Sequence, residues 1–139
     1  MPVDPLRSPA GERLDPLWVS LRVLLAGLIA AHGWARALAG GVAPFGSFLE
    51  AQGLPAGAWL AMGITGLEII GPVSLLIGRA VAPLCALYSL IYMAGIVLVH
   101  APAGWFVVGL GRNGSEYSVL LIACLLMVGW RHHRPWRGD

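Results

Sequence analysis

The chain has 139 residues, of which 58% are hydrophobic and 12% are charged, about half the charged share of an ordinary soluble domain. Its net charge of +2 is small and all its basic charges are arginines; without aromatic residues interleaved among them, we expect no nucleic-acid partner. Two cysteines are too few for a secreted disulfide scaffold. The composition indicates one small domain that is embedded in a lipid bilayer.

Four apolar segments follow an irregular, proline-rich lead-in at residues 1–16. The first three are long enough to be spanning helices. We predict these helices at Leu17–Leu38, at about Ala58–Ile77 and at Ala80–Val99. The fourth run, Tyr117–Trp130, has 14 residues, so it spans only if its helix begins nearer Gly114 and brings Glu116 to the membrane edge. The first segment is too long for the core of a signal peptide, and we expect it to be retained.

These segments predict an all-α fold, an integral membrane four-helix bundle over residues 17–130 with a basic tail at residues 131–139. With four spans, both termini and the turn between the second and third helices lie on one side of the membrane. The arginines on that side are Arg7, Arg13, Arg79, Arg131, Arg134 and Arg137. The other side has Arg112, with Arg36 close to it. The positive-inside rule therefore predicts that both termini are cytoplasmic.

Ionisable residues within the apolar segments need partners, because a lone charge at the bilayer centre costs about 3 kcal/mol on insertion scales. Arg22, His32 and Arg36 share one face of the first helix. Glu68 lies near the middle of the second helix, about 7 Å in depth from both Arg22 and His32. Because arginine has the longer reach, we predict a structural ion pair between Arg22 and Glu68, with His32 as a hydrogen-bond partner.

Further polar residues are expected to meet at the outer end of the bundle, where the third helix ends and the fourth begins. They define a candidate proton or ligand pocket formed by His32, Arg36, His100, Glu116 and Tyr117, with Trp105 and Phe106 near its mouth. Ionisable residues that converge inside a membrane mark a functional site by default. Hydrogen-bonded packing explains the same group equally well, and both interpretations stay open at this point.

Metal and redox sites have weaker signals in the sequence. The pocket has suitable ligand types, but no tight HxxxH or CxxC spacing is present, and we predict no metal site. Cys85 and Cys124 have no basic neighbour in sequence that would stabilise a thiolate, so we expect inert packing groups. No phosphate loop, dinucleotide fingerprint or nucleophile elbow occurs. No cofactor is identified, and whether the protein is an enzyme stays open.

Five stretches in order resemble the DoxX family of small bacterial membrane proteins. They are an arginine early in the first helix, HGWAR at its end, GLEIIGPVSLLIGR through the second, a histidine before GWF after the third, and GSEY at the start of the fourth. The resemblance covers about residues 18–130. The matching positions are Arg22, His32, Gly33, Arg36, Glu68, Gly71, Gly78, His100, Gly104, Glu116 and Tyr117. Pro72 departs from the family's usual second glycine, and Arg36 stands where lysine is common.

The resemblance implies two classes of function in a bacterial cytoplasmic membrane. DoxX-like proteins include the membrane subunit of a thiosulfate:quinone oxidoreductase, so one hypothesis is a redox-linked subunit whose outer pocket binds a quinone-like molecule. Other relatives are accessory proteins, so the alternative is a non-enzymatic structural subunit that docks within the membrane onto a larger complex. Other membrane subunits or further copies of this chain are the expected protein partners. A solute pathway is disfavoured because four short helices leave little room for a lumen.

Overall fold

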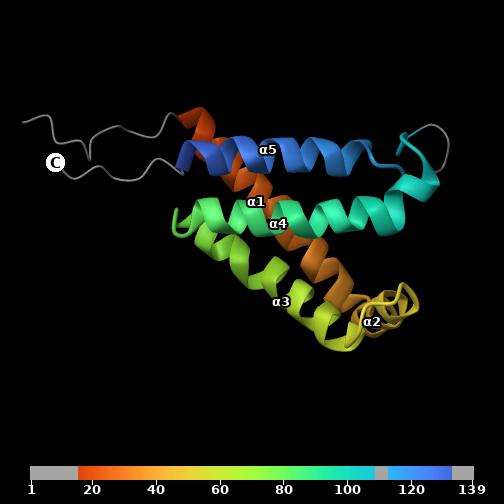
Figure 1. Ribbon diagram of the computed structural model, residues 1–139. Coiled ribbons are helices and arrows are strands. Elements are labelled where there is room, and N and C mark those ends of the chain that lie inside the picture. Colours follow the sequence, from red (N-terminus) through yellow and green to blue (C-terminus); the bar gives the residue numbers. More distant parts are fainter. Residues whose placement is uncertain (1–15, 109–112, 133–139) are drawn as a thin grey trace, which may run out of the picture.

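The computed structural model describes residues 16–108 and 113–132, which are helical with short connections and no strands (Figure 1). Its α-helices are α1 (Pro16–Leu38), α2 (Val42–Ala51), α3 (Gly57–Leu76), α4 (Val81–Gly95) and α5 (Glu116–His132). Helix α4 continues into a π-helix, η2 (Ile96–His100), and a 3-10 turn, η3 (Ala101–Ala103). The first 15 residues of the predicted lead-in, Arg112 and the tail beyond residue 132 lie outside the described residues, and Pro16 begins α1.

Three helical segments are long and apolar enough to cross a membrane: Pro16–Leu38, Gly57–Leu76 and Val81–Ala103. The prediction of an all-α membrane protein is therefore confirmed. Helix α5 begins at Glu116 and has 17 residues, the lower limit for a spanning helix. Large apolar side chains face outward on three helices, since Ile70, Leu90, Leu120 and Trp130 are 63–80% exposed. Apolar surface on this scale requires a lipid or protein neighbour.

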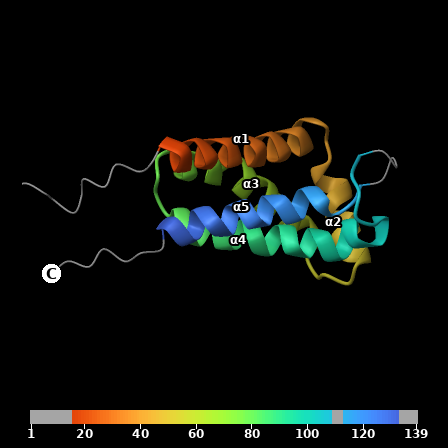
Figure 2. The ribbon, with the colours of Figure 1, turned by 90° about the horizontal axis from the view of Figure 1, so that it is seen from above.

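The helices form two pairs, because α1 packs along α3 and α4 packs along α5. The start of α1, the turn between α3 and α4, and the end of α5 lie at one end of the molecule, which we call the terminal end (Figure 2). Helix α2 lies at the opposite end, which we call the α2 end. Helix α3 meets α4 at the terminal end and moves away from it toward α2 (Figure 1). The pairs therefore diverge toward the α2 end.

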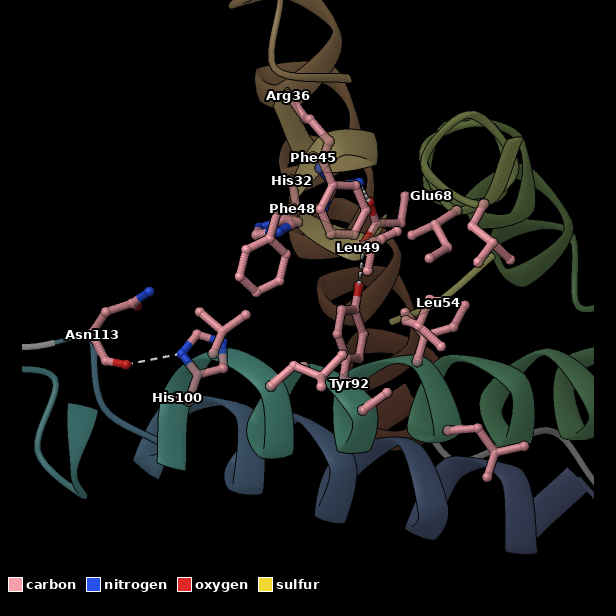
Figure 3. Close-up of a pocket in the computed structure, with 18 residues that line it drawn as sticks. His32, Arg36, Phe45, Phe48, Leu49, Leu54, Glu68, Tyr92, His100 and Asn113 are labelled. Carbon is pink, nitrogen blue, oxygen red and sulfur yellow. Dashed lines mark hydrogen bonds and ion pairs between the residues drawn. The ribbon is translucent and has the colours of Figure 1, made fainter. Parts of the chain in front are cut away.

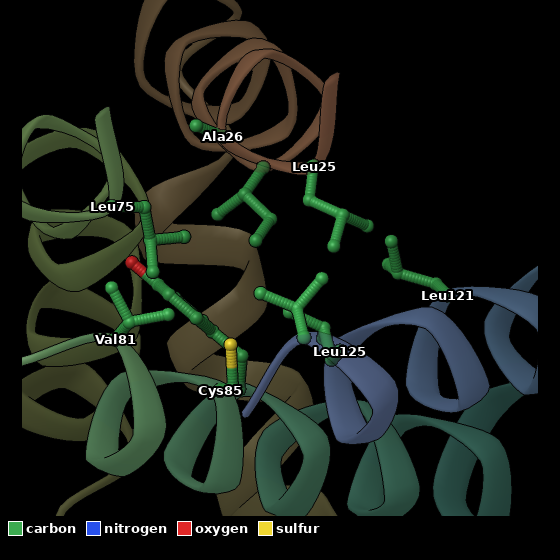
Figure 4. Close-up of a cluster of buried hydrophobic side chains, with 10 residues drawn as sticks. Leu25, Ala26, Leu75, Val81, Cys85, Leu121 and Leu125 are labelled. Atoms are coloured by element: carbon green, nitrogen blue, oxygen red, sulfur yellow. The ribbon is translucent and has the colours of Figure 1, made fainter. Parts of the chain in front are cut away.

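The apolar core fills the space where the two pairs meet (Figure 4). Its buried members are Leu25, Ala26, Ile29, Leu75, Val81, Cys85, Tyr88, Leu121, Leu125 and Val128. The Tyr88 hydroxyl donates a 2.7 Å hydrogen bond to the Leu67 carbonyl, which satisfies the one polar group of this buried ring. A Cβ atom at Gly71 would collide with that hydroxyl. Glycine at position 71 thus lets Tyr88 connect α4 to the backbone of α3.

Helix α2 lies between the first two predicted spanning helices, where no helix is predicted, so the structure has five α-helices among its described residues and not the predicted four. The segment is short, and its glycines and Pro44 are typical of loops. Gly46 packs against the start of α3, where an added Cβ would lie 2.9 Å from the Ala58 Cα. This tertiary contact stabilises a helix that its own sequence does not predict.

Helix α1 packs tightly against α3 at Gly33. We expect Gly33→Ala to lower the free energy of unfolding by about 1–3 kcal/mol, because the new Cβ would lie 2.7 Å from the Glu68 Cβ and 3.0 Å from its carbonyl carbon. Gly27→Ala on the same helix is the control, since no atom lies within 4 Å of its Cβ position. Thermal unfolding of the purified variants in lipid nanodiscs measures both effects. Equal stability of the two variants would contradict this close helix contact.

Candidate functional site

A buried ion pair between Arg36 and Glu68 lies between α1 and α3. The Glu68 side chain is 1% exposed, and its Oε2 accepts a 2.6 Å hydrogen bond from Arg36 Nη1. Its other oxygen, Oε1, accepts a hydrogen bond from the Tyr92 hydroxyl at 3.3 Å. The predicted pairing of Glu68 with Arg22 is therefore wrong, and the predicted hydrogen bond from His32 is replaced by the one from Tyr92.

The pairing differs from the prediction because α1 and α3 contact each other in a different register. Gly33 lies directly against Glu68, so Arg36, about one turn further along α1, is at the level of the carboxylate. Arg22 lies near the terminal end, where its Nη1 is close to Gly78. Counting depth from the ends of the apolar segments missed this offset, since only the contact at Gly33 fixes the register.

Arg22 instead joins the first helix to the last. The Nδ1 atom of His132 lies 2.8 Å from the Val128 carbonyl, which can only accept, so Nδ1 donates. In the neutral ring, His132 Nε2 then accepts from Arg22 Nη1 at 3.1 Å. Arg22 is buried, and its Nε has no hydrogen-bond partner in the described part of the chain. The family-like arginine thus holds α1 against α5 at the terminal end.

Further contacts fix the guanidinium of Arg36. Its Nη1 also donates to the Thr65 hydroxyl at 3.1 Å, and that hydroxyl donates to the Ala61 carbonyl at 2.7 Å. The Arg36 Cζ lies 4.6 Å from the centre of the Phe45 ring of α2, a distance suited to a cation–π contact. Helices α1 and α4 therefore contact the Glu68 carboxylate of α3 directly, through Arg36 and Tyr92, and α2 contacts Arg36.

A cavity of about 560 Å³ opens beside this ion pair, where the helix pairs diverge at the α2 end (Figure 3). Its polar and aromatic lining comes from His32, Arg36, Phe45, Phe48, Glu68, Tyr92, His100 and Asn113. Its apolar walls come from Leu49, Leu54, Leu60, Ile64, Leu90, Ile91, Leu98 and Val99, with Ala94 and Gly95. The structure thus brings together three of the five predicted pocket residues, His32, Arg36 and His100.

The other two predicted residues do not line the cavity. The Glu116 Oε1 accepts a 2.9 Å hydrogen bond from the backbone N–H of Val107 and closes the loop before α5. Tyr117 is 47% exposed on α5. The aromatic side chains at the cavity are Phe45 and Phe48, not the predicted Trp105 and Phe106, which are each 54% exposed. Sequence reasoning missed the two phenylalanines because helix α2 itself was missed.

His100 is positioned by an irregular stretch of helix. It ends the π-helix η2, and such widened turns occur frequently at functional sites. Its Nδ1 lies 2.9 Å from the Asn113 carbonyl, to which it donates. Figure 3 shows the ring on the cavity side of its helix, below Phe48. His32 lines the same cavity from α1 and is exposed.

Neither cysteine lines this cavity, and the two do not form a disulfide. Both are free; Cys85 is buried and Cys124 is half-buried. Cys85 lines a second cavity of about 580 Å³ between α4 and α5, whose other lining residues are Ala82, Pro83, Ala86, Leu125, Leu126, Gly129 and Trp130. Within residues 16–108 and 113–132, no group of three or more His, Cys, Asp and Glu side chains could hold a metal ion.

Comparison with known proteins adds information at the level of the family. The model described as DoxX matches residues 17–101, more than half of the chain. The matched region runs from α1 through η2 and contains every residue that lines the cavity at the α2 end except Asn113. No curated protein and no solved structure matches the chain.

The corrected pairing is tested by a double-mutant cycle. We expect Glu68→Gln to lower the free energy of unfolding by about 2–3 kcal/mol, because it leaves Arg36 without its counter-charge; fully buried pairs lose more, but the Arg36 side chain is 15% exposed. Adding Arg36→Met should recover part of that loss in thermal unfolding. Adding Arg22→Met should increase the loss additively. Recovery with Arg22→Met and not with Arg36→Met would restore the original prediction.

Proposed function

We propose a function on one established premise: the chain belongs to the DoxX family. Within that family, we propose that it is a redox-linked membrane subunit whose cavity at the α2 end binds a quinone-like molecule. The observation that carries the proposal is the composition of the cavity, in which apolar walls surround one ion-paired carboxylate, a tyrosine and two histidines. A largely apolar pocket with a few convergent polar groups is typical of small-molecule sites.

The size and the aromatic lining support a ring-shaped ligand. The volume of about 560 Å³ lies within the range of roughly 300–1,000 Å³ found for small-molecule pockets. Phe45 and Phe48 from α2 face Tyr92 and His100 from the α4 side (Figure 3). Aromatic rings stack favourably on one another at such a site. The apolar neighbours Leu90 and Val99 suit the apolar tail that anchors a quinone in a bilayer.

The second candidate function is that of a non-enzymatic accessory subunit. It is favoured by the apolar cavity between α4 and α5, which small residues such as Ala82, Ala86 and Gly129 leave open. Small residues at a helix surface allow another membrane helix to approach closely. On this reading, the contacts of Glu68 serve only to fix the positions of the helices. The two candidates are separated by ligand binding at the α2 end.

The proposed topology has α5 as the fourth span and both ends of the chain on the cytoplasmic side of a bacterial cytoplasmic membrane. The start of α1 and the end of α5 lie together at the terminal end (Figure 2). Arg79 in the adjacent turn and Arg131 in α5 belong to the same end, which the positive-inside rule places in the cytoplasm. The cavity at the α2 end then opens near the periplasmic face.

Reporter fusions test this topology. A fluorescent protein that matures only in the cytoplasm should be active when fused after Asp139 and inactive when inserted between Gly40 and Gly41, close to α2. The matched fusions use a phosphatase that is active only in the periplasm, and we expect the opposite result. Phosphatase activity after Asp139 would contradict both the orientation and the periplasmic position of the cavity.

Ligand binding tests the proposed site. A short-chain hydroquinone, kept reduced under anaerobic conditions, should bind the wild-type protein in nanodiscs, and His32→Ala with His100→Ala should weaken binding by at least tenfold, since both lining groups are removed. Cys85→Ser with Cys124→Ser is the control, because Cys85 lines the other cavity and neither cysteine lines this one. Thermal unfolding verifies that each variant is folded. Loss of binding in the cysteine variant alone would overturn the proposed site.

A further inference from the structure

Several hydrogen-bond donors near the buried end of the α2-end cavity already have acceptors within the protein. Arg36 Nη1 donates to both Glu68 and Thr65, and the Tyr92 hydroxyl donates to Glu68. The Thr65 hydroxyl donates to the Ala61 carbonyl. The Arg36 Cζ lies 4.6 Å from the centre of the Phe45 ring, a contact that uses none of its N–H groups. The donors left for a ligand at this end of the cavity are therefore the N–H groups of Arg36 Nε and Nη2.

The acceptors of the cavity also have capacity left. His100 Nδ1 must carry a proton because it donates to the Asn113 carbonyl, so the Nε2 of the neutral ring has a free lone pair. The two oxygens of Glu68 each receive one hydrogen bond, whereas a carboxylate has about four lone-pair sites. His32 and the Asn113 side chain also line the cavity. Each of them offers both a donor and an acceptor, so they suit either type of ligand.

We propose that the cavity binds the reduced, hydroxylated form of its ring ligand, a hydroquinone, in preference to the quinone, with a ring hydroxyl donating to His100 Nε2. This inference rests on the proposed function of the cavity. A quinone carbonyl only accepts, so opposite Nε2 it would place two acceptors against each other and leave both without a hydrogen bond. A hydroquinone hydroxyl donates to the same atom without any change in the Asn113 contact.

The preference has a measurable size. One additional hydrogen bond at a partly exposed site changes affinity on the order of tenfold. The bound couple would then be easier to reduce than the free couple, because the reduced form is held more tightly. For a two-electron couple, a tenfold ratio of dissociation constants raises the midpoint potential by about 30 mV. This shift is a consequence of binding alone and requires no electron acceptor in the protein.

The test titrates a short-chain benzoquinone and its hydroquinone, kept reduced under anaerobic conditions, into the full-length protein in nanodiscs. We expect the wild-type protein to bind the hydroquinone about tenfold more tightly. His100→Phe keeps a ring and removes the acceptor, so the ratio of the two dissociation constants should fall to about one. His100→Gln should recover part of the ratio, because its amide can donate to Asn113 and accept from the ligand. His32→Phe, the control, should weaken both forms and keep the ratio.

The possible outcomes separate this inference from the proposed function. Equal affinity for both forms in the wild-type protein would overturn the preference and leave the quinone-like site in place. An unchanged ratio in a folded His100→Phe variant would also overturn it, since another group would then be the acceptor. If His100→Phe does not fold, His100→Gln decides. A ratio of the two dissociation constants lower than in the wild type supports His100 as the acceptor. If the quinone affinity is unchanged at the same time, the effect comes from the hydrogen bond that the hydroquinone hydroxyl donates. Binding of neither form would overturn both proposals.

Discussion

The ion pair between Arg36 and Glu68 sets the constraint that the other contacts at the α2 end satisfy. A carboxylate that is 1% exposed among apolar helices is stable only with a counter-charge and with its lone pairs occupied. Arg36 supplies the charge and Tyr92 a hydrogen bond. Gly33 lets α1 approach closely enough for Arg36 to reach. Phe45 then positions α2 over the guanidinium, and the cavity is the space that remains between these fixed groups.

The cavity and the ion pair are consequences of one geometry. Helices α1 and α3 are in tight contact at Gly33 and Glu68, while the Tyr92 hydroxyl of α4 donates to Glu68 at 3.3 Å. The wider gap between the helix pairs is the cavity, and both pairs contribute to its lining, for example through His32 of α1 and His100 of η2. A structural role of Glu68 and a ligand-binding role of its surroundings are therefore compatible. The carboxylate holds the wall of the cavity in place, and the groups around it present the acceptors.

The fold was largely predictable from the sequence, and the site only in part. Long apolar runs gave α1, α3 and α4 to within a few residues, because length and hydropathy are local properties. The helical period placed His32, Arg36 and His100 toward a common interior, and all three line the cavity. The partner of Glu68 was wrong because helix register depends on the contact at Gly33, which no periodicity encodes. Helix α2 was missed since tertiary packing of Gly46 stabilises it. Glu116 was misplaced because its backbone partner, Val107, lies in an irregular loop.

The link between Arg22 and His132 has a consequence for biogenesis. Arg22 lies in α1, and its hydrogen-bond partner, His132, is the last residue of α5. Helices α2 to α5 are therefore synthesised between the arginine and its partner. Until α5 is in place, the Arg22 guanidinium lacks this hydrogen bond in the terminal half of α1. The contact thus forms only once α5 has packed against α1, whatever the cavity binds.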